Sequence, residues 1–278
     1  MINQKDGKKL IVTYGGDLKE FERNIGSLIN LASGFSYVQC IVCYWNDKPI
    51  PEKLLIDDRF SFEYHALSSN EKDEEIKKAE RSKYPEYTIS CIIQSIIHKK
   101  FSQVLELYKK EEGTIYCKTR SDLLITRNFR AIDLVDKAAA NDAVFCGSRK
   151  FGIGLTDYML LSSDPNKLYS VLDYSDILQV LCNVSIFPPP EVVLAFNCQS
   201  RQISVISHEG FPAILVKAGH DGSLVHRTSY KNEKNVKEYR YGNDYIETVY
   251  YNVGWVLKKV SALLLVMRIC VLRIFRLL

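Results

Sequence analysis

The stretch LIVTYGGD, residues 10–17, decides how the start of the chain folds. Its first five residues are apolar or β-branched, which is typical of a short buried strand. Gly15, Gly16 and Asp17 then predict a turn in which the backbone can approach a nucleotide closely. The full G-x-G-x-x-G pattern of dinucleotide-binding proteins is absent, and an ordinary tight turn remains the alternative.

The elements after this strand predict the fold class. Apolar residues at helical spacing predict a helix over 18–31, and two further apolar runs predict strands over 37–45 and 60–66. Strands that alternate with helices are typical of an α/β domain with a mostly parallel central sheet. The highly charged segment 68–83 is expected beside the sheet as a solvated helix or a loop.

The second half of the domain continues this pattern. A wide apolar stripe predicts a helix over 87–108, in which Ser90 and Gln94 share one face. These two side chains either point together into a site or line a polar seam. Further strands are expected at 114–117, 143–146 and 158–161, and further helices over 164–181 and from residue 191. Asp164 is the predicted N-cap of the first of these helices.

Composition excludes some classes of function. The 278 residues carry a net charge of only +4, and the sequence lacks the clustered basic stripes that are typical of a nucleic-acid-binding protein. The eight cysteines lie in apolar surroundings and predict buried, reduced thiols and hence the cytoplasm. Cys40 and Cys43 have the spacing of metal ligands, but no second close pair completes a zinc site. Hydrolase and kinase motifs are also missing.

The main chemical signal is KTRSD at 118–122, at the end of a predicted central strand. Ligands of open α/β sheets bind at the carboxyl ends of the strands. Lys118 and Arg120 could bind a diphosphate, and Asp122 could hold a divalent metal. A surface salt-bridge cluster is the alternative.

Two weaker signals come from single carboxylates that could contact the acceptor of a transferred sugar. Asp157 follows a glycine-containing turn and could act as a general base for an acceptor hydroxyl; otherwise it only forms the turn. Glu191 follows a proline and could orient a sugar, although a glutamate there also complements a helix dipole.

In their order and spacing across about residues 8–200, these segments resemble the bacterial WavE-type lipopolysaccharide-synthesis glycosyltransferases. The resemblance rests on the opening strand with Gly-Gly-Asp, ISCIIQS at 89–95, KTRSD at 118–122, GLTDY at 154–158 and Pro190-Glu191. It implies a GT-A-like, Rossmann-related domain. In GT-A enzymes a D-x-D motif binds the metal and the diphosphate. Here the comparable string is Arg120-Ser121-Asp122, so a cation replaces the first carboxylate.

The resemblance implies a role for each candidate residue. Lys118 and Arg120 would bind the diphosphate of a nucleotide-sugar donor, and Asp122 would hold Mn²⁺, Mg²⁺ or the donor sugar and take part in catalysis. Asp157 would be the base or an acceptor contact. Gly15, Gly16 and Asp17 would lie near the nucleotide, while Gln94 and Glu191 would contact the acceptor.

The C-terminal segment differs from the rest of the chain. Residues 258–278 are apolar but are interrupted by three arginines, which makes them a poor membrane-spanning helix. As a helix, Lys258, Lys259, Arg273 and Arg276 fall within about 100° of one another, which suits an anionic membrane surface. Docking on the domain or on a second subunit is the alternative. We expect a transferase domain over residues 1–230 and a C-terminal helical extension over 231–278.

The sequence therefore predicts a glycosyltransferase that moves a sugar to a lipopolysaccharide, lipooligosaccharide or capsule acceptor. It would be cytoplasmic and peripheral on the inner face of the cytoplasmic membrane, with no nucleic-acid partner. One alternative is a non-catalytic glycan- or lipid-binding peripheral membrane protein. The other is a sugar nucleotidyltransferase, although its Gly-rich N-terminal loop with a basic residue is missing.

Overall fold

The structure is a computed structural model of the chain. It describes residues 7–16, 18, 21, 25–48, 58–79, 85–120, 123–125, 131–132, 143–146, 149–150, 154–155, 159–174, 190–207, 224–226, 236–241 and 245–250.

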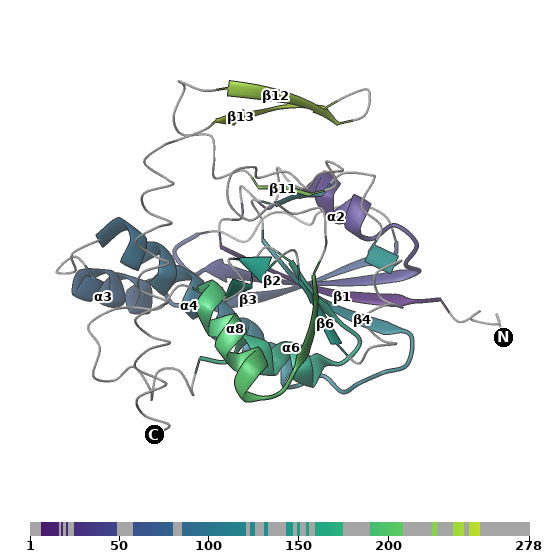
Figure 1. Cartoon of the computed structure of the whole chain (residues 1–278), viewed down its shortest axis with the longest axis horizontal. Helices are drawn as coiled ribbons and strands as arrows, with labels where there is room; N and C mark the ends of the chain where they lie inside the picture. Colours follow the sequence, from purple (N-terminus) through teal and green to yellow (C-terminus); the bar gives the residue numbers. More distant parts are fainter. Residues whose placement is uncertain are drawn as a thin grey trace.

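A seven-stranded sheet with the order β10-β6-β9-β4-β1-β2-β3 forms the centre of the domain (Figure 1). Its strands are β1 (Lys9–Gly16), β2 (Tyr37–Trp45), β3 (Phe60–Leu67), β4 (Thr114–Thr119), β6 (Ala143–Cys146), β9 (Met159–Ser162) and β10 (Ser204–Ser207). β9 runs antiparallel to both of its neighbours, and every other pair is parallel. The predicted α/β fold with a mostly parallel sheet is confirmed.

Helices cover both faces of this sheet (Figure 1). α2 (Ile25–Leu31) packs on one face, and α4 (Pro85–Leu105), α6 (Pro165–Leu172) and α8 (Pro190–Ser200) pack on the other. The charged segment forms α3 (Ser69–Ala79) beside α4. Three short antiparallel pairs complete the described chain: β5 (Leu123–Ile125) with β11 (Leu224–His226), β7 (Arg149–Lys150) with β8 (Gly154–Leu155), and β12 (Val236–Tyr241) with β13 (Tyr245–Tyr250).

Each face of the sheet has its own apolar core because successive strand residues point to opposite sides. On β1, Leu10 and Val12 face α2, whereas Ile11 faces α4. The cysteine side chains are buried and outside any disulfide, as predicted, at Cys40, Cys43, Cys91, Cys117 and Cys198. Burial raises the pKa of Cys43 and of Cys198 to about 12. Among the described residues, no group of His, Cys, Asp and Glu side chains could hold a metal ion.

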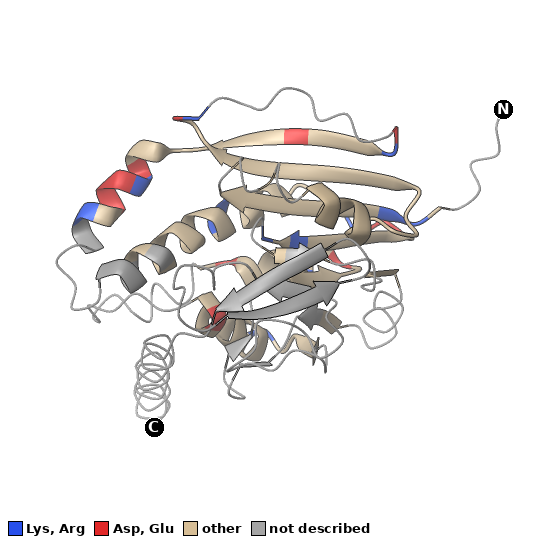
Figure 2. Cartoon of the chain, turned by 90° about the horizontal axis from the view of Figure 1, so that it is seen from above, with Lys and Arg blue, Asp and Glu red and all other residues tan. Residues whose placement is uncertain are grey.

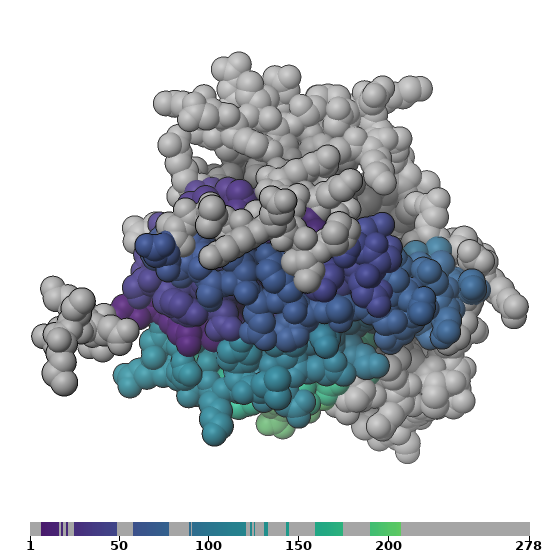
Figure 3. All heavy atoms as spheres, turned by 180° about the vertical axis from the view of Figure 1, so that it is seen from behind, coloured from purple at the N-terminus to yellow at the C-terminus, as the bar shows by residue number. Residues whose placement is uncertain are grey.

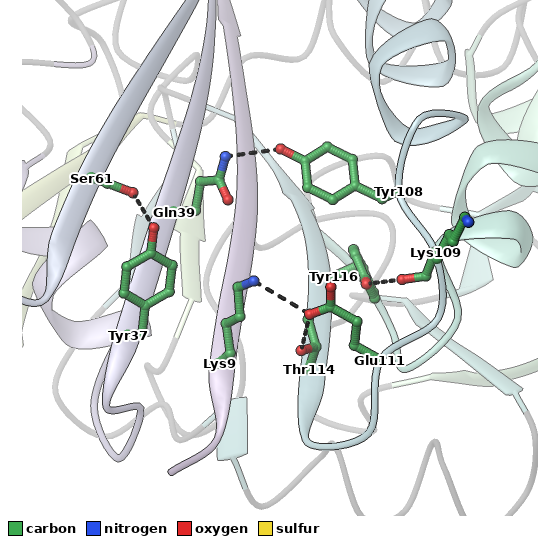
Figure 4. Close-up of polar contacts among 9 residues, drawn as sticks. All are labelled: Lys9, Tyr37, Gln39, Ser61, Tyr108, Lys109, Glu111, Thr114 and Tyr116. Atoms are coloured by element: carbon green, nitrogen blue, oxygen red, sulfur yellow. Dashed lines mark hydrogen bonds and ion pairs between the residues drawn. The ribbon is translucent and has the colours of Figure 1, made fainter. Parts of the chain in front are cut away.

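Polar contacts secure the amino-terminal edge of the sheet (Figure 4). Lys9 Nζ lies 3.3 Å from Glu111 Oε2, and Tyr116 Oη donates to the Lys109 carbonyl over 2.6 Å. Tyr108, just past the end of α4, accepts from Gln39 Nε2 over 2.9 Å. These contacts place the end of α4 at the amino edge, so the helix runs antiparallel to the parallel strands.

The link between α6 and α8 departs from the sequence-based expectation. Asp164 caps α6 as predicted, and its Oδ1 accepts from the Asn166 amide over 2.9 Å. The helix was expected to reach residue 181, yet it ends at Leu172 because Asp173 is extended. Asn197 of α8 donates to the carbonyls of Val171 and Asp173, so a partner from another element satisfies this helix end.

Charge is concentrated on α3, at the left of Figure 2, which carries both acidic and basic residues, while most of the sheet is uncharged. Seen from behind (Figure 3), the first half of the chain, in purple, blue and teal, forms most of the described surface. No described helix is both long enough and apolar enough to cross a membrane.

Candidate functional site

The strand order creates a switch point between β1 and β4. The chain passes from β1 outward through β2 and β3, and then returns to the other side of β1 as β4. In open α/β sheets, ligands bind in the crevice outside the carboxyl ends of the strands at such a point. Thr13 is in register with Lys118, so Gly15 and Gly16 lie at the same end of the sheet as the KTRSD segment. This end, where the parallel strands finish, is called the carboxyl edge below.

Lys118 is fully buried near this edge. Its neighbour Tyr116 packs in the core on the α4 side, so the alternation of β4 places Lys118 on that side too. Lys118 is therefore not exposed at the surface. Burying an ammonium group costs several kcal/mol unless anionic or acceptor groups compensate it, with an idealised limit of about 20 kcal/mol.

The last residue of β4, Thr119, points to the opposite face and is 1% exposed. Its hydroxyl oxygen has no hydrogen-bond partner among the described residues. A buried polar group without a partner costs roughly 1–3 kcal/mol, so this hydroxyl is available to a ligand at the carboxyl edge. The sequence prediction missed Thr119, although the alternation next to Lys118 is the signal that could have found it. Arg120 follows, half-buried, directly after the strand.

The fold itself explains both glycines of β1. A Cβ atom on Gly15 would lie 2.4 Å from Ile97 Cγ2 and 2.8 Å from Phe101 Cζ, so α4 packs directly on the strand backbone there. Gly16 has a φ of +117°, in the left-handed region that side chains other than hydrogen disfavour. Their nearness to a nucleotide, predicted from the sequence, stays a prediction.

Gln94 lies on the face of α4 that points at β1. Gln94 lies seven positions before Phe101, a spacing of about 20° around the helix and about 10.5 Å along it. Because α4 runs antiparallel to β1 and Phe101 packs on Gly15, Gln94 lies beyond the end of β1, at the carboxyl edge. Its side chain is half-buried there.

Glu191 reaches the same edge from α8. Only residues 201–203 join α8 to β10, and β10 starts at the amino edge because it runs parallel to β6. The first turn of α8, with half-buried Glu191, is therefore directed toward the carboxyl edge. Arg201 fixes the other end of the helix, since its guanidinium lies 2.7 Å from Asp173 Oδ2.

The structure thus brings six of the predicted residues to one edge: Gly15, Gly16, Gln94, Lys118, Arg120 and Glu191. Three others, Asp17, Asp122 and Asp157, lie outside the described residues, as does the segment 258–278. Their predicted roles are untested. Asp122 follows the last residue of β4 by only three positions in the chain.

Comparisons with known proteins give a distant structural likeness. No family model matches the chain, and no curated protein matches its sequence, so the WavE-type family is not confirmed. Among solved structures, the glycosyltransferase GlyE of Streptococcus pneumoniae TIGR4 is similar at a TM-score of 0.43 and 13% identity, covering 73% of this chain. The apo form of GlyE is similar at a TM-score of 0.39 and 12% identity, covering 71% of this chain. In both cases the match spans 45% of the GlyE chain.

Proposed function

We propose that the chain is a glycosyltransferase whose nucleotide-sugar donor binds at the carboxyl edge between β1 and β4. One observation carries this proposal: the topological switch point of the sheet coincides with the buried cation Lys118 and with Arg120. Ligands of open α/β sheets bind at such a point, and paired cations suit the diphosphate of a nucleotide-sugar.

The chemistry assigned to these residues is displacement at the anomeric carbon of the donor sugar. The oxygen of an acceptor hydroxyl forms a bond to this carbon, while the bond from the carbon to the diphosphate oxygen breaks. The electron pair of the broken bond leaves with the nucleoside diphosphate, whose charge Lys118 and Arg120 stabilise. Asp157 takes the proton of the acceptor hydroxyl.

The GT-A likeness of the sequence also implies a divalent metal. The described residues supply no group of carboxylates for it, and the one candidate ligand is Asp122. When bound, such a metal would neutralise diphosphate charge. The steps above use only Lys118, Arg120 and Asp157.

The acceptor belongs to the same proposal. The sequence resemblance favours a lipopolysaccharide, lipooligosaccharide or capsule precursor at the inner face of the cytoplasmic membrane. The test is release of nucleoside diphosphate from a panel of nucleotide-sugars, with membranes of a capsulated or lipopolysaccharide-producing bacterium as the acceptor. Release that requires the membranes supports the proposal. Failure of every donor to turn over contradicts it.

Membrane association is proposed to depend on the segment 260–278. Deleting it is expected to release the protein from the membrane fraction, because its apolar and basic residues bind an anionic surface. Replacing Arg273 and Arg276 by glutamine should weaken binding to phosphatidylglycerol vesicles by roughly fivefold per charge, since each is worth about 1 kcal/mol. Neutral phosphatidylcholine vesicles serve as the control in cosedimentation. Unchanged binding of the deletion variant would show that another part of the chain binds the membrane.

A further inference from the structure

Gln94 lies near the same edge of the sheet as the proposed donor site. Its helix α4 packs on β1 through Ile97 and Phe101, whose side chains lie where a Cβ atom of Gly15 would be. Gln94 shares the face of these two residues and lies about one turn, or about 4.5 Å, beyond Ile97 toward the helix start. This position is next to the carboxyl end of β1, at the switch point of the sheet, where ligands of open α/β sheets bind.

The chemistry of the Gln94 side chain limits which groups of a ligand it can bind. An amide offers two donors and an acceptor oxygen but carries no charge. It therefore suits the neutral groups of a ligand, such as sugar hydroxyls or a base edge, better than a phosphate. On the same helix Ile92, Ile96 and Ile97 are apolar and buried, whereas Gln94 is half-buried, as are Ile93 and Ser95.

We propose that Gln94 is a specificity residue for the donor, hydrogen-bonded to the neutral part of the nucleotide-sugar, and not an acceptor contact. This inference rests on the proposed function. The donor is favoured because Gln94 lies just past Gly15 and Gly16, next to the carboxyl end of β1. The strand paired with β1 is β4, which carries Lys118. If Lys118 and Arg120 bind the diphosphate, the neutral parts of the donor lie next to the carboxyl end of β1 and the start of α4.

The test uses Gln94→Met, which removes the hydrogen bonds and keeps the approximate shape of the side chain. The loss of one or two hydrogen bonds is expected to raise the donor KM by roughly three- to tenfold. The acceptor KM should not change. Gln103→Met is the matched control, because Gln103 is exposed near the other end of the same helix, and it should leave both constants at the wild-type values.

Binding of the nucleoside diphosphate alone, measured by calorimetry, locates the contact. A weaker affinity of Gln94→Met for this fragment assigns the amide to the nucleoside, whereas an unchanged affinity with a raised donor KM assigns it to the transferred sugar. A raised acceptor KM with an unchanged donor KM would overturn the inference and leave the proposed function standing. A wild-type protein that neither binds nor turns over any donor would overturn both.

Discussion

Replacing Gly15 by alanine is expected to lower the free energy of unfolding by about 1–3 kcal/mol, because the added Cβ overpacks a close helix–strand contact. The new atom would lie 2.4 Å from Ile97 Cγ2 and 2.8 Å from Phe101 Cζ, so α4 or β1 must shift. For a chain of this size the melting temperature should fall by roughly 2–12 °C. Thermal unfolding followed by circular dichroism measures the change.

The matched control is Gly26→Ala, within α2. A Cβ atom there would meet nothing within 4 Å, and alanine favours a helix over glycine by up to about 1 kcal/mol. This variant should melt at or above the wild-type temperature. If Gly15→Ala instead kept the wild-type melting temperature and lost only donor affinity, the glycine would serve the nucleotide and not the packing of α4.

Replacing Asp122 by asparagine is expected to reduce transfer by at least about 100-fold, the usual cost of removing one preorganised electrostatic group. The substitution keeps the shape of the side chain but removes the charge proposed to hold a metal or the donor sugar. The protein should still fold, because asparagine is nearly isosteric with aspartate. Release of nucleoside diphosphate measures the activity, and the melting temperature checks the fold.

Asp73→Asn is the control for this variant. Asp73 is exposed on α3, and removing its charge should change the rate very little. Near-normal turnover of Asp122→Asn would remove Asp122 from the site and leave Lys118 and Arg120 as its charged residues.

The elements of the fold could be predicted because their signals are local. The apolar runs at β1, β2 and β4 and the stripe of α4 bury side chains whose spacing matches the strand and helix periods. The alternation of these elements also predicted the parallel sheet. The antiparallel insertion of β9 had no such signal, because the choice of strand partner is decided by packing in the whole sheet.

The site was predictable in its position and less so in its details. The carboxyl ends of β1 and β4 follow from the fold class, so Gly15 and Arg120 could be assigned to one edge. The full burial of Lys118 and the packing of Ile97 against Gly15 depend on how α4 crosses the sheet, which residue spacing does not encode. The early end of α6 likewise depends on a side chain of α8, Asn197.

Donor binding tests the central claim most directly. Melting curves of the purified protein are measured with UDP-, GDP-, CMP- and dTDP-sugars, each with and without Mn²⁺. A donor present at 100-fold its Kd stabilises the folded state by about 2.7 kcal/mol, which raises the melting temperature by roughly 5–10 °C. The proposed function predicts such a shift for one nucleotide class, and its loss when Lys118 and Arg120 are both replaced by methionine. Absence of a shift with every donor, with and without acceptor, would contradict it and favour a glycan- or lipid-binding protein.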